Sequence, residues 1–252
     1  MSKKPKERVT IVYGKNPIVL VCPHGYDDNQ TDILTATAAK ELDCNALINH
    51  GWKRAKLVDE LNSIANCNNF NHVMDTANMA VNDEYGRPLI RLVNRALKKS
   101  SLTRANKFGY EEQNIYLIHV HGVGDWIKKT VKDKDLTAII GYGQSDKPSH
   151  TCRKWEAETL GHYLTLNGLK TYMGANGGNY CARAKINMNQ LFKLYPQYRI
   201  ETVRSMQVEL TYDSRSDNTK AEKTGKLLAK AVKSLLDHNL LDPKIGTVFP
   251  TV

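Results

Sequence analysis

Apolar residues along this 252-residue chain fall into short continuous runs, which alternate with longer stretches of helical spacing. Continuous apolar runs of this length are typical of strands that are buried on both faces of a sheet. The runs predict strands over residues 9–13, 18–22, 46–49, 115–120, 136–140, 170–173 and 205–212.

The stretches between these runs carry apolar residues every three or four positions, as on one face of a helix. They predict helices over residues 31–42, 89–97, 155–166 and 219–236, and a weaker helix over 55–64. Strands that alternate with helices predict an α/β fold, with a central sheet covered by helices on both faces. No linker rich in proline, glycine or serine divides the chain, so we expect one domain over residues 1–252, with a flexible basic tail at 1–8.

The chain carries 36 Lys and Arg against 26 Asp and Glu, a formal net charge of +10. This surplus favours an anionic partner such as a carboxylate-rich substrate, although a solvated lysine-rich surface explains it equally well. The lysines are not interleaved with aromatic residues and no nucleic-acid-binding module is present, which argues against nucleic acid as a partner.

The sequence contains no run of about 18 apolar residues, so it predicts no membrane-spanning helix. No apolar signal core follows the basic N-terminal residues, so we expect a cytoplasmic location.

The five cysteines are odd in number, scattered and never spaced as CxxC. This pattern argues against a disulfide framework and against a cysteine zinc site. Cys22 lies inside an apolar run, where an inert buried thiol is expected rather than a nucleophile. No GxSxG sequence is present either, so a serine or cysteine hydrolase is disfavoured.

Residues of metal-binding type follow the predicted strand at 18–22, in the sequence VLVCPHGYDD. Functional residues of open α/β sheets gather at the carboxyl ends of the strands. Imidazole and carboxylate groups are good zinc ligands, and a catalytic zinc takes three protein ligands plus a water. His24 and Asp27 are spaced to bind one ion together. Asp28 is expected to be solvated or to cap the next helix.

The third ligand is expected from the sequence IHVHG, which contains His119 and His121. Both point to the same face of a strand, so alternation does not choose between them. Glu209 is a carboxylate inside the apolar run MQVEL and is the candidate general base. Each of these residues also has a plainer interpretation as a loop or edge-strand residue. The order His-x-x-Asp, then His, then Glu, each at a predicted strand end, favours the metal site.

This order resembles the zinc carboxypeptidase superfamily, and in particular the N-formylglutamate amidohydrolase family with its phage-type poly-γ-glutamate hydrolase relatives. The stretches that carry the resemblance are VCPHGYDDNQTD, LINHGWKRA, IANCNN, IHVHG and SMQVELTY. The resemblance implies a three-layer α/β/α sandwich with a central mixed, mostly parallel sheet. It also implies one zinc ion per chain and a glutamate that activates water to cleave an amide bond.

Carried over to this chain, the resemblance makes His24, Asp27 and His121 the zinc ligands. Glu209 becomes the general base and proton shuttle. Arg54, in the sequence GWKRA, would polarise the scissile carbonyl or hold a substrate carboxylate.

The chain departs from the family pattern at two places. Family members usually carry an Asn-Arg pair that grips the terminal carboxylate of the substrate, but here the matching stretch ends in Asn68 and Asn69 and lacks the arginine. Arg183 is the candidate replacement. His119 stands where the family has an acid, two residues before the third ligand.

The predicted function is zinc-dependent hydrolysis of an amide bond in a carboxylate-bearing substrate, either an N-acyl amino acid or a glutamate-like, γ-glutamyl or peptide compound. The alternative is a catalytically inactive member of the same fold that binds an anionic ligand or nucleic acid. A binding module need not keep three metal ligands and a general base together, so their joint presence favours an enzyme.

Overall fold

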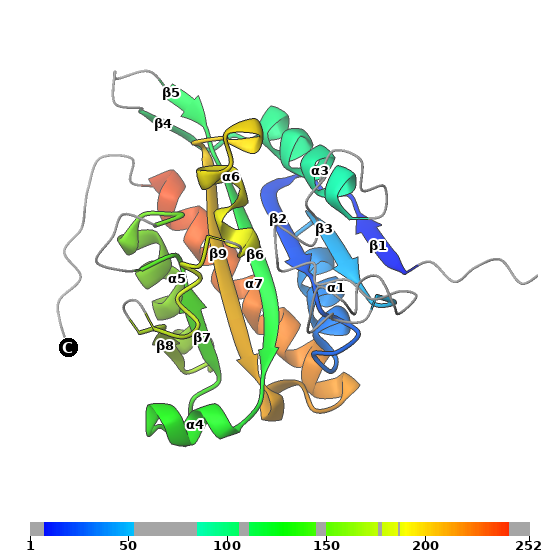
Figure 1. Ribbon diagram of the computed structural model, residues 1–252, viewed down its shortest axis with the longest axis vertical. Coiled ribbons are helices and arrows are strands. Elements are labelled where there is room, and N and C mark those ends of the chain that lie inside the picture. The colour runs from blue at the N-terminus through cyan, green and yellow to red at the C-terminus, as the bar shows by residue number, and fades with distance from the viewer. Residues whose placement is uncertain are drawn as a thin grey trace, which may run out of the picture.

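A seven-stranded mixed sheet forms the centre of the computed structural model, which describes residues 8–52, 85–105, 111–144, 150–175, 178–185 and 187–241 (Figure 1). From one edge to the other, its strands are β1 (Val9–Val12), β3 (Cys44–Asn49), β2 (Asn16–Cys22), β6 (Ile115–Val123), β9 (Val203–Thr211), β7 (Ala138–Gly141) and β8 (Thr171–Met173). A separate antiparallel pair is formed by β4 (Thr103–Ala105) and β5 (Glu111–Gln113).

The four central strands, β3, β2, β6 and β9, run parallel to one another. β1 is antiparallel to β3, and β7 is antiparallel to β9. The chain passes from β2 to β3 on one side and later returns to β6 on the other side, so the strand order reverses at β2. In sheets of this kind, ligands bind in the crevice outside the carboxyl ends of the strands at such a point. His24 follows β2 after Pro23, and His121 lies near the end of β6.

Helices cover both faces of the sheet (Figure 1). One face packs against α1 (Thr31–Glu41), α5 (Lys154–Leu166) and α7 (Asn218–Leu241). The other face packs against α3 (Gly86–Lys99) and α6 (Leu191–Leu194), while α4 (Trp126–Val131) follows the end of β6. No helix within the described ranges combines the length and the apolar character needed to span a bilayer.

Side-chain alternation in β6 and β9 decides which face carries the polar residues. In β6, Ile118 packs in the core under α1 and α7, whereas Leu117 packs in the core under α3. His119 and His121 have the parity of Leu117, so both lie on the α3 face. Glu209 has the parity of Val203, which also packs under α3, so it lies on that face too.

The predicted α/β fold with a mixed, mostly parallel sheet is confirmed, and each predicted strand has a counterpart within a few residues. The predicted helices correspond to α1, α3, α5 and α7. The sequence pattern missed α4, α6, β4 and β5, because segments of three to six residues are too short to show a period. The predicted helix at 55–64 and residues 1–7 of the predicted tail lie outside the described residues, and the single domain stays a prediction.

Helix α7 approaches α1 closely at Gly225. A Cβ atom on Gly225 would lie 2.5 Å from the carbonyl oxygen of Leu34 and 3.0 Å from the Cβ of Thr37. Gly161 in α5 is also buried, but a Cβ there would meet its nearest neighbours at 3.5 Å, an ordinary van der Waals distance. Close packing therefore requires a glycine at position 225 but not at position 161. The two positions form a matched pair for substitution.

We predict that Gly225→Ala lowers the free energy of unfolding by about 1–3 kcal/mol, because the added methyl group pushes α7 away from α1. Gly161→Ala should leave this free energy unchanged or raise it by up to about 1 kcal/mol, because alanine favours the helix. Urea unfolding of both variants beside the wild type measures the difference. Equal effects of the two substitutions would contradict the close approach of α1 and α7.

Candidate metal centre

The segment after β2 folds into a turn that brings His24 and Asp28 together. The backbone N–H of Asp28 donates to the carbonyl of His24 at 2.7 Å, as in one turn of a helix, and residues four apart in such a turn are neighbours on its surface. Nδ1 of His24 and Oδ2 of Asp28 are 3.6 Å apart, and the side chains are only 2% and 11% exposed. The side chain of Asp27 is exposed instead.

His121 completes the group from the neighbouring strand. Its Nδ1 lies 3.7 Å from the same Oδ2 of Asp28, and its ring centroid lies 5.1 Å from that of His24. The N–H of Gly122 donates to this oxygen at 3.1 Å and fixes the carboxylate against β6. One ligand atom from each of His24, Asp28 and His121 lies within 4.8 Å of the other two.

This group suits a zinc ion in ligand type and in the two ligand separations that involve Asp28. Tetrahedral zinc with bonds of about 2.0–2.2 Å separates its ligand atoms by about 3.3–3.6 Å. The Asp28 oxygen lies 3.6 and 3.7 Å from the two imidazole nitrogens. Two imidazoles and one carboxylate also leave a fourth position, which is the arrangement of catalytic rather than structural zinc sites.

The charge state of Asp28 also suits a metal ligand. Burial raises the pKa of Asp28, but hydrogen bonds and charge interactions with His121 and His24 outweigh this effect and hold the pKa well below its usual range. The carboxyl group is therefore ionised near neutral pH, which is the form that binds a metal ion.

The carboxylate in the group differs from the sequence prediction. The spacing H-x-x-D predicts Asp27 as the ligand, but the turn directs Asp27 toward solvent and Asp28 toward the two histidines. The prediction that Asp28 is solvated or caps the next helix is wrong. The N-cap of α1 is Gln30, and no side chain caps that helix end.

Of the two histidines in β6, His121 lies with His24, whereas His119 lies two residues deeper in the sheet. His119 is paired in register with Val21 of β2 and Gln207 of β9, and it is buried. Neither of its ring nitrogens has a hydrogen-bond partner within the described residues. Burial, together with the neighbouring His121, lowers the pKa of His119 to about 3, so the ring is neutral.

Glu209 lies beside the group. It pairs in register with His121 across the parallel strands β6 and β9, on the same face of the sheet. Side chains in such positions have Cβ atoms about 5 Å apart. Glu209 is 9% exposed, and Nε2 of Gln207 donates to its Oε1 at 3.3 Å. A carboxylate suited to proton transfer therefore lies beside His121 of this group.

The remaining predicted site residues are not among the grouped side chains His24, Asp28 and His121. Arg183 is exposed, in the segment at 178–185. Arg54, Asn68 and Asn69 lie outside the described residues, so their predicted roles stay predictions. Cys22 is buried, and burial raises the pKa of its thiol to about 12, which agrees with an inert cysteine.

Two further residues of this site had no place in the sequence prediction. Gly122 binds the Asp28 carboxylate through its backbone, and the only signal for it is its position directly after His121 in HVHG. Arg215, in the 3-10 helix η3 (Tyr212–Arg215), is buried and donates to carbonyl groups at the ends of β6 and β9. No sequence signal marked Arg215, because its partners are backbone carbonyl groups.

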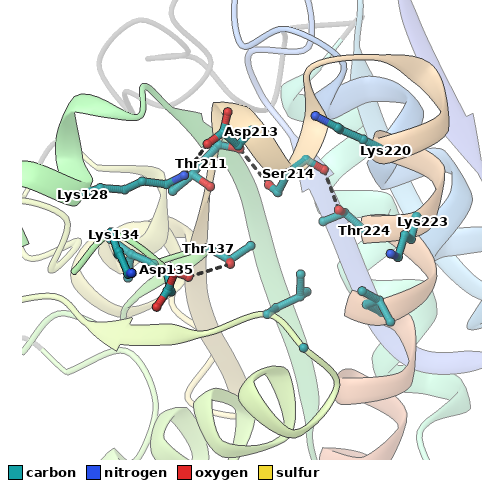
Figure 2. Close-up of a pocket in the computed structure, with 14 residues that line it drawn as sticks. Lys128, Lys134, Asp135, Thr137, Thr211, Asp213, Ser214, Lys220, Lys223 and Thr224 are labelled. Carbon is teal, nitrogen blue, oxygen red and sulfur yellow. Dashed lines mark hydrogen bonds and ion pairs between the residues drawn. The ribbon is translucent and has the colours of Figure 1, made fainter.

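Part of the positive charge gathers in a separate cleft of about 310 Å³ beside the start of α7 (Figure 2). Its lining includes Lys128, Lys134, Lys220 and Lys223. Lys128 is paired with Asp213, at 2.5 Å, and it is also close to Asp125. None of the three grouped side chains of the candidate metal centre lines this cleft, so the basic surface and the metal centre are distinct features.

No protein-family model matches the chain, and no curated protein matches it. Solved structures do match. N-formylglutamate amidohydrolase from Ralstonia eutropha superposes with a TM-score of 0.55 at 12% identity, over 92% of this chain and 99% of the other. The chain has the fold of the zinc carboxypeptidases.

Two further structures support the same fold. A bacteriophage poly-γ-glutamate hydrolase gives a TM-score of 0.53 at 11% identity and covers 94% of each chain. A proposed carboxypeptidase from Burkholderia mallei gives 0.53 at 11% identity, over 91% of this chain and 60% of the other. At these identities the similarity establishes the fold, and the chemistry depends on the residues described above.

We predict that His119→Leu stabilises the metal-free protein, and that the gain grows as the pH falls from about 6.5 to about 3. In this window the unfolded chain binds a proton at residue 119 that the native protein does not, so the wild type loses stability on acidification. The pKa difference limits the effect to about 5 kcal/mol. Urea unfolding across this range measures it, with His162→Leu on the exposed face of α5 as the control. A constant difference between wild type and His119→Leu at every pH would contradict the prediction.

Proposed function

We propose that the protein is a zinc-dependent hydrolase that cleaves an amide bond. His24, Asp28 and His121 hold the metal ion, and Glu209 is the general base. The observation that carries this proposal is the convergence of the three metal-binding side chains within 4.8 Å of one another, with Glu209 in register beside His121. The group lies at the strand ends where this class of sheet binds its ligands.

Each described residue has a definite task in this reaction. A zinc ion, when bound, supplies the Lewis acidity that polarises an amide carbonyl and acidifies water. Glu209 accepts a proton from the attacking water and transfers it to the leaving nitrogen. Gln207 orients the Glu209 carboxylate through its hydrogen bond to Oε1. Gly122 holds Oδ2 of Asp28 in place between the two imidazoles.

The substrate that we propose bears carboxylates: an N-acyl amino acid, or a glutamate-like, γ-glutamyl or peptide compound. The activities named for the structural relatives, an N-formylglutamate amidohydrolase and a poly-γ-glutamate hydrolase, support this class. The net charge of +10 agrees with an anionic substrate. Arg54, Asn68, Asn69 and Arg183 are the candidate substrate-binding residues, and a cytoplasmic location remains our expectation.

We predict that the wild-type protein binds about one zinc ion per chain, and that His24→Ala and Asp28→Asn each abolish tight binding by removing a ligand. Asp27→Asn is the matched control, because it makes the same change one residue away on an exposed side chain. Elemental analysis by plasma mass spectrometry after dialysis measures the metal content. Loss of zinc in Asp27→Asn but not in Asp28→Asn would show that Asp27 is the ligand, as the H-x-x-D spacing predicts. A wild type that takes up no zinc would overturn the proposed function.

We predict that Glu209→Gln keeps the zinc but lowers kcat by about 10²–10⁴-fold, because the amide cannot accept a proton. Hydrolysis of N-formylglutamate and of poly-γ-glutamate measures the activity, and Glu158→Gln on the exposed side of α5 is the control. Full activity in Glu209→Gln would remove this residue from the reaction. A zinc-loaded wild type that binds these compounds without cleaving them would instead support the inactive binding module.

A further inference from the structure

Arg215 joins the turn after β2 to the ends of β6 and β9. Its guanidinium group donates three hydrogen bonds, all to backbone carbonyl oxygens. Nε donates to Leu210 at 3.1 Å, Nη1 to Asn29 at 2.5 Å and Nη2 to Val123 at 3.3 Å. The side chain is buried, with 3% exposure, so these bonds form away from bulk solvent.

Each of these three carbonyl groups belongs to a segment that carries a residue of the site. Asn29 follows Asp28, Leu210 follows Glu209, and Val123 comes two residues after His121. A planar guanidinium with donors in a fixed fork sets the relative positions of its partners more strictly than a flexible ammonium does. Arg215 thus connects the β2 turn, the end of β6 and the end of β9 through one rigid group.

Gly122 makes room for this guanidinium. A Cβ atom at Gly122 would lie 2.3 Å from both Cζ and Nη2 of Arg215, far inside van der Waals contact. The N–H of the same glycine donates to Oδ2 of Asp28. Gly122 therefore leaves the space that the guanidinium occupies, and its backbone N–H binds the candidate ligand Asp28. In this way Gly122 links Arg215 to the Asp28 carboxylate.

The charge of Arg215 also suits this position. Burial lowers the pKa of its guanidinium, whereas the charges of Asp28 and Glu209 raise it, and arginine remains protonated in proteins. None of the described acids is hydrogen-bonded to Arg215, since its donors go to carbonyl groups. Its positive charge therefore offsets two neighbouring carboxylates without occupying an oxygen that either needs for metal binding or proton transfer.

We propose that Arg215 is a positioning residue that holds Asp28 and His121 at metal-binding spacing, with Glu209 beside them, before the ion arrives. This inference rests on the proposed function. In this role Arg215 touches neither the metal ion nor the substrate. Its contribution is to preorganise the site, so that binding does not have to draw the β2 turn and β6 together or to place β9 beside them.

The test compares zinc affinity with stability in Arg215→Lys and Arg215→Met. The first keeps the charge without the fork, and the second removes both. Gly122→Ala is a third variant, because it retains Arg215 but excludes its guanidinium from this site. Arg91→Met on the exposed face of α3 is the control. Competition with a chromophoric chelator measures zinc affinity, and thermal unfolding of the metal-free proteins measures stability.

We expect all three site variants to unfold cooperatively without metal and to bind zinc at least about tenfold more weakly than the wild type, as is typical when a residue that supports a ligand is lost. Arg91→Met should bind zinc like the wild type. Wild-type affinity in a folded Arg215→Lys or Arg215→Met variant would overturn the inference and leave the proposed function standing. Failure of even Arg215→Lys to fold would make Arg215 a residue of the fold rather than of the site. Absence of zinc binding in the wild type would overturn the proposed function, and the inference with it.

Discussion

The parallel pairing of β6 with both β2 and β9 is the constraint on which the candidate site depends. His24 comes from the end of β2, His121 from β6 and Glu209 from β9, and only this pairing brings them to one edge of the sheet. A slip of one residue in the register of β6 would turn His121 from the α3 face to the opposite core. The apolar residues of β6, which alternate between two cores, oppose such a slip, so packing of the interior fixes the geometry of the polar edge.

Electrostatics at this edge follow from the burial that the fold imposes. An ionised carboxylate with little exposure is costly unless it has partners. Asp28 meets this requirement with two imidazoles and the backbone N–H of Gly122, and the charge of Arg215 lies nearby. His119 shows the opposite situation, because its buried ring has no hydrogen-bond partner within the described residues and remains neutral. His119 and His121 are therefore two residues apart on one strand, yet His121 belongs to the candidate metal centre and His119 belongs to the interior.

Much of this arrangement could be predicted from the sequence. The central strands are continuous apolar runs, and His24, His121 and Glu209 stand out because each is a polar residue at the end of such a run or within it. The choice between Asp27 and Asp28 could not be predicted, because both follow His24 by about one helical turn and the turn geometry decides which one faces the histidines. Arg215 left no signal, because it acts through carbonyl groups that every residue possesses. The short helix α4 could not be predicted either, because six residues show no reliable hydrophobic period.

The order of these segments along the chain has a consequence for synthesis. Val19 pairs with Leu117, and His121 pairs with Glu209, so the edge of the sheet is closed by contacts between distant parts of the sequence. Contacts of this kind form slowly, because long loops must close before the contacts contribute. A nascent chain emerges with its N-terminus first, so the turn that carries His24 leaves the ribosome long before β9 can join the sheet. Until β9 arrives, β6 has one open edge, and through this edge the growing chain can pair with another molecule.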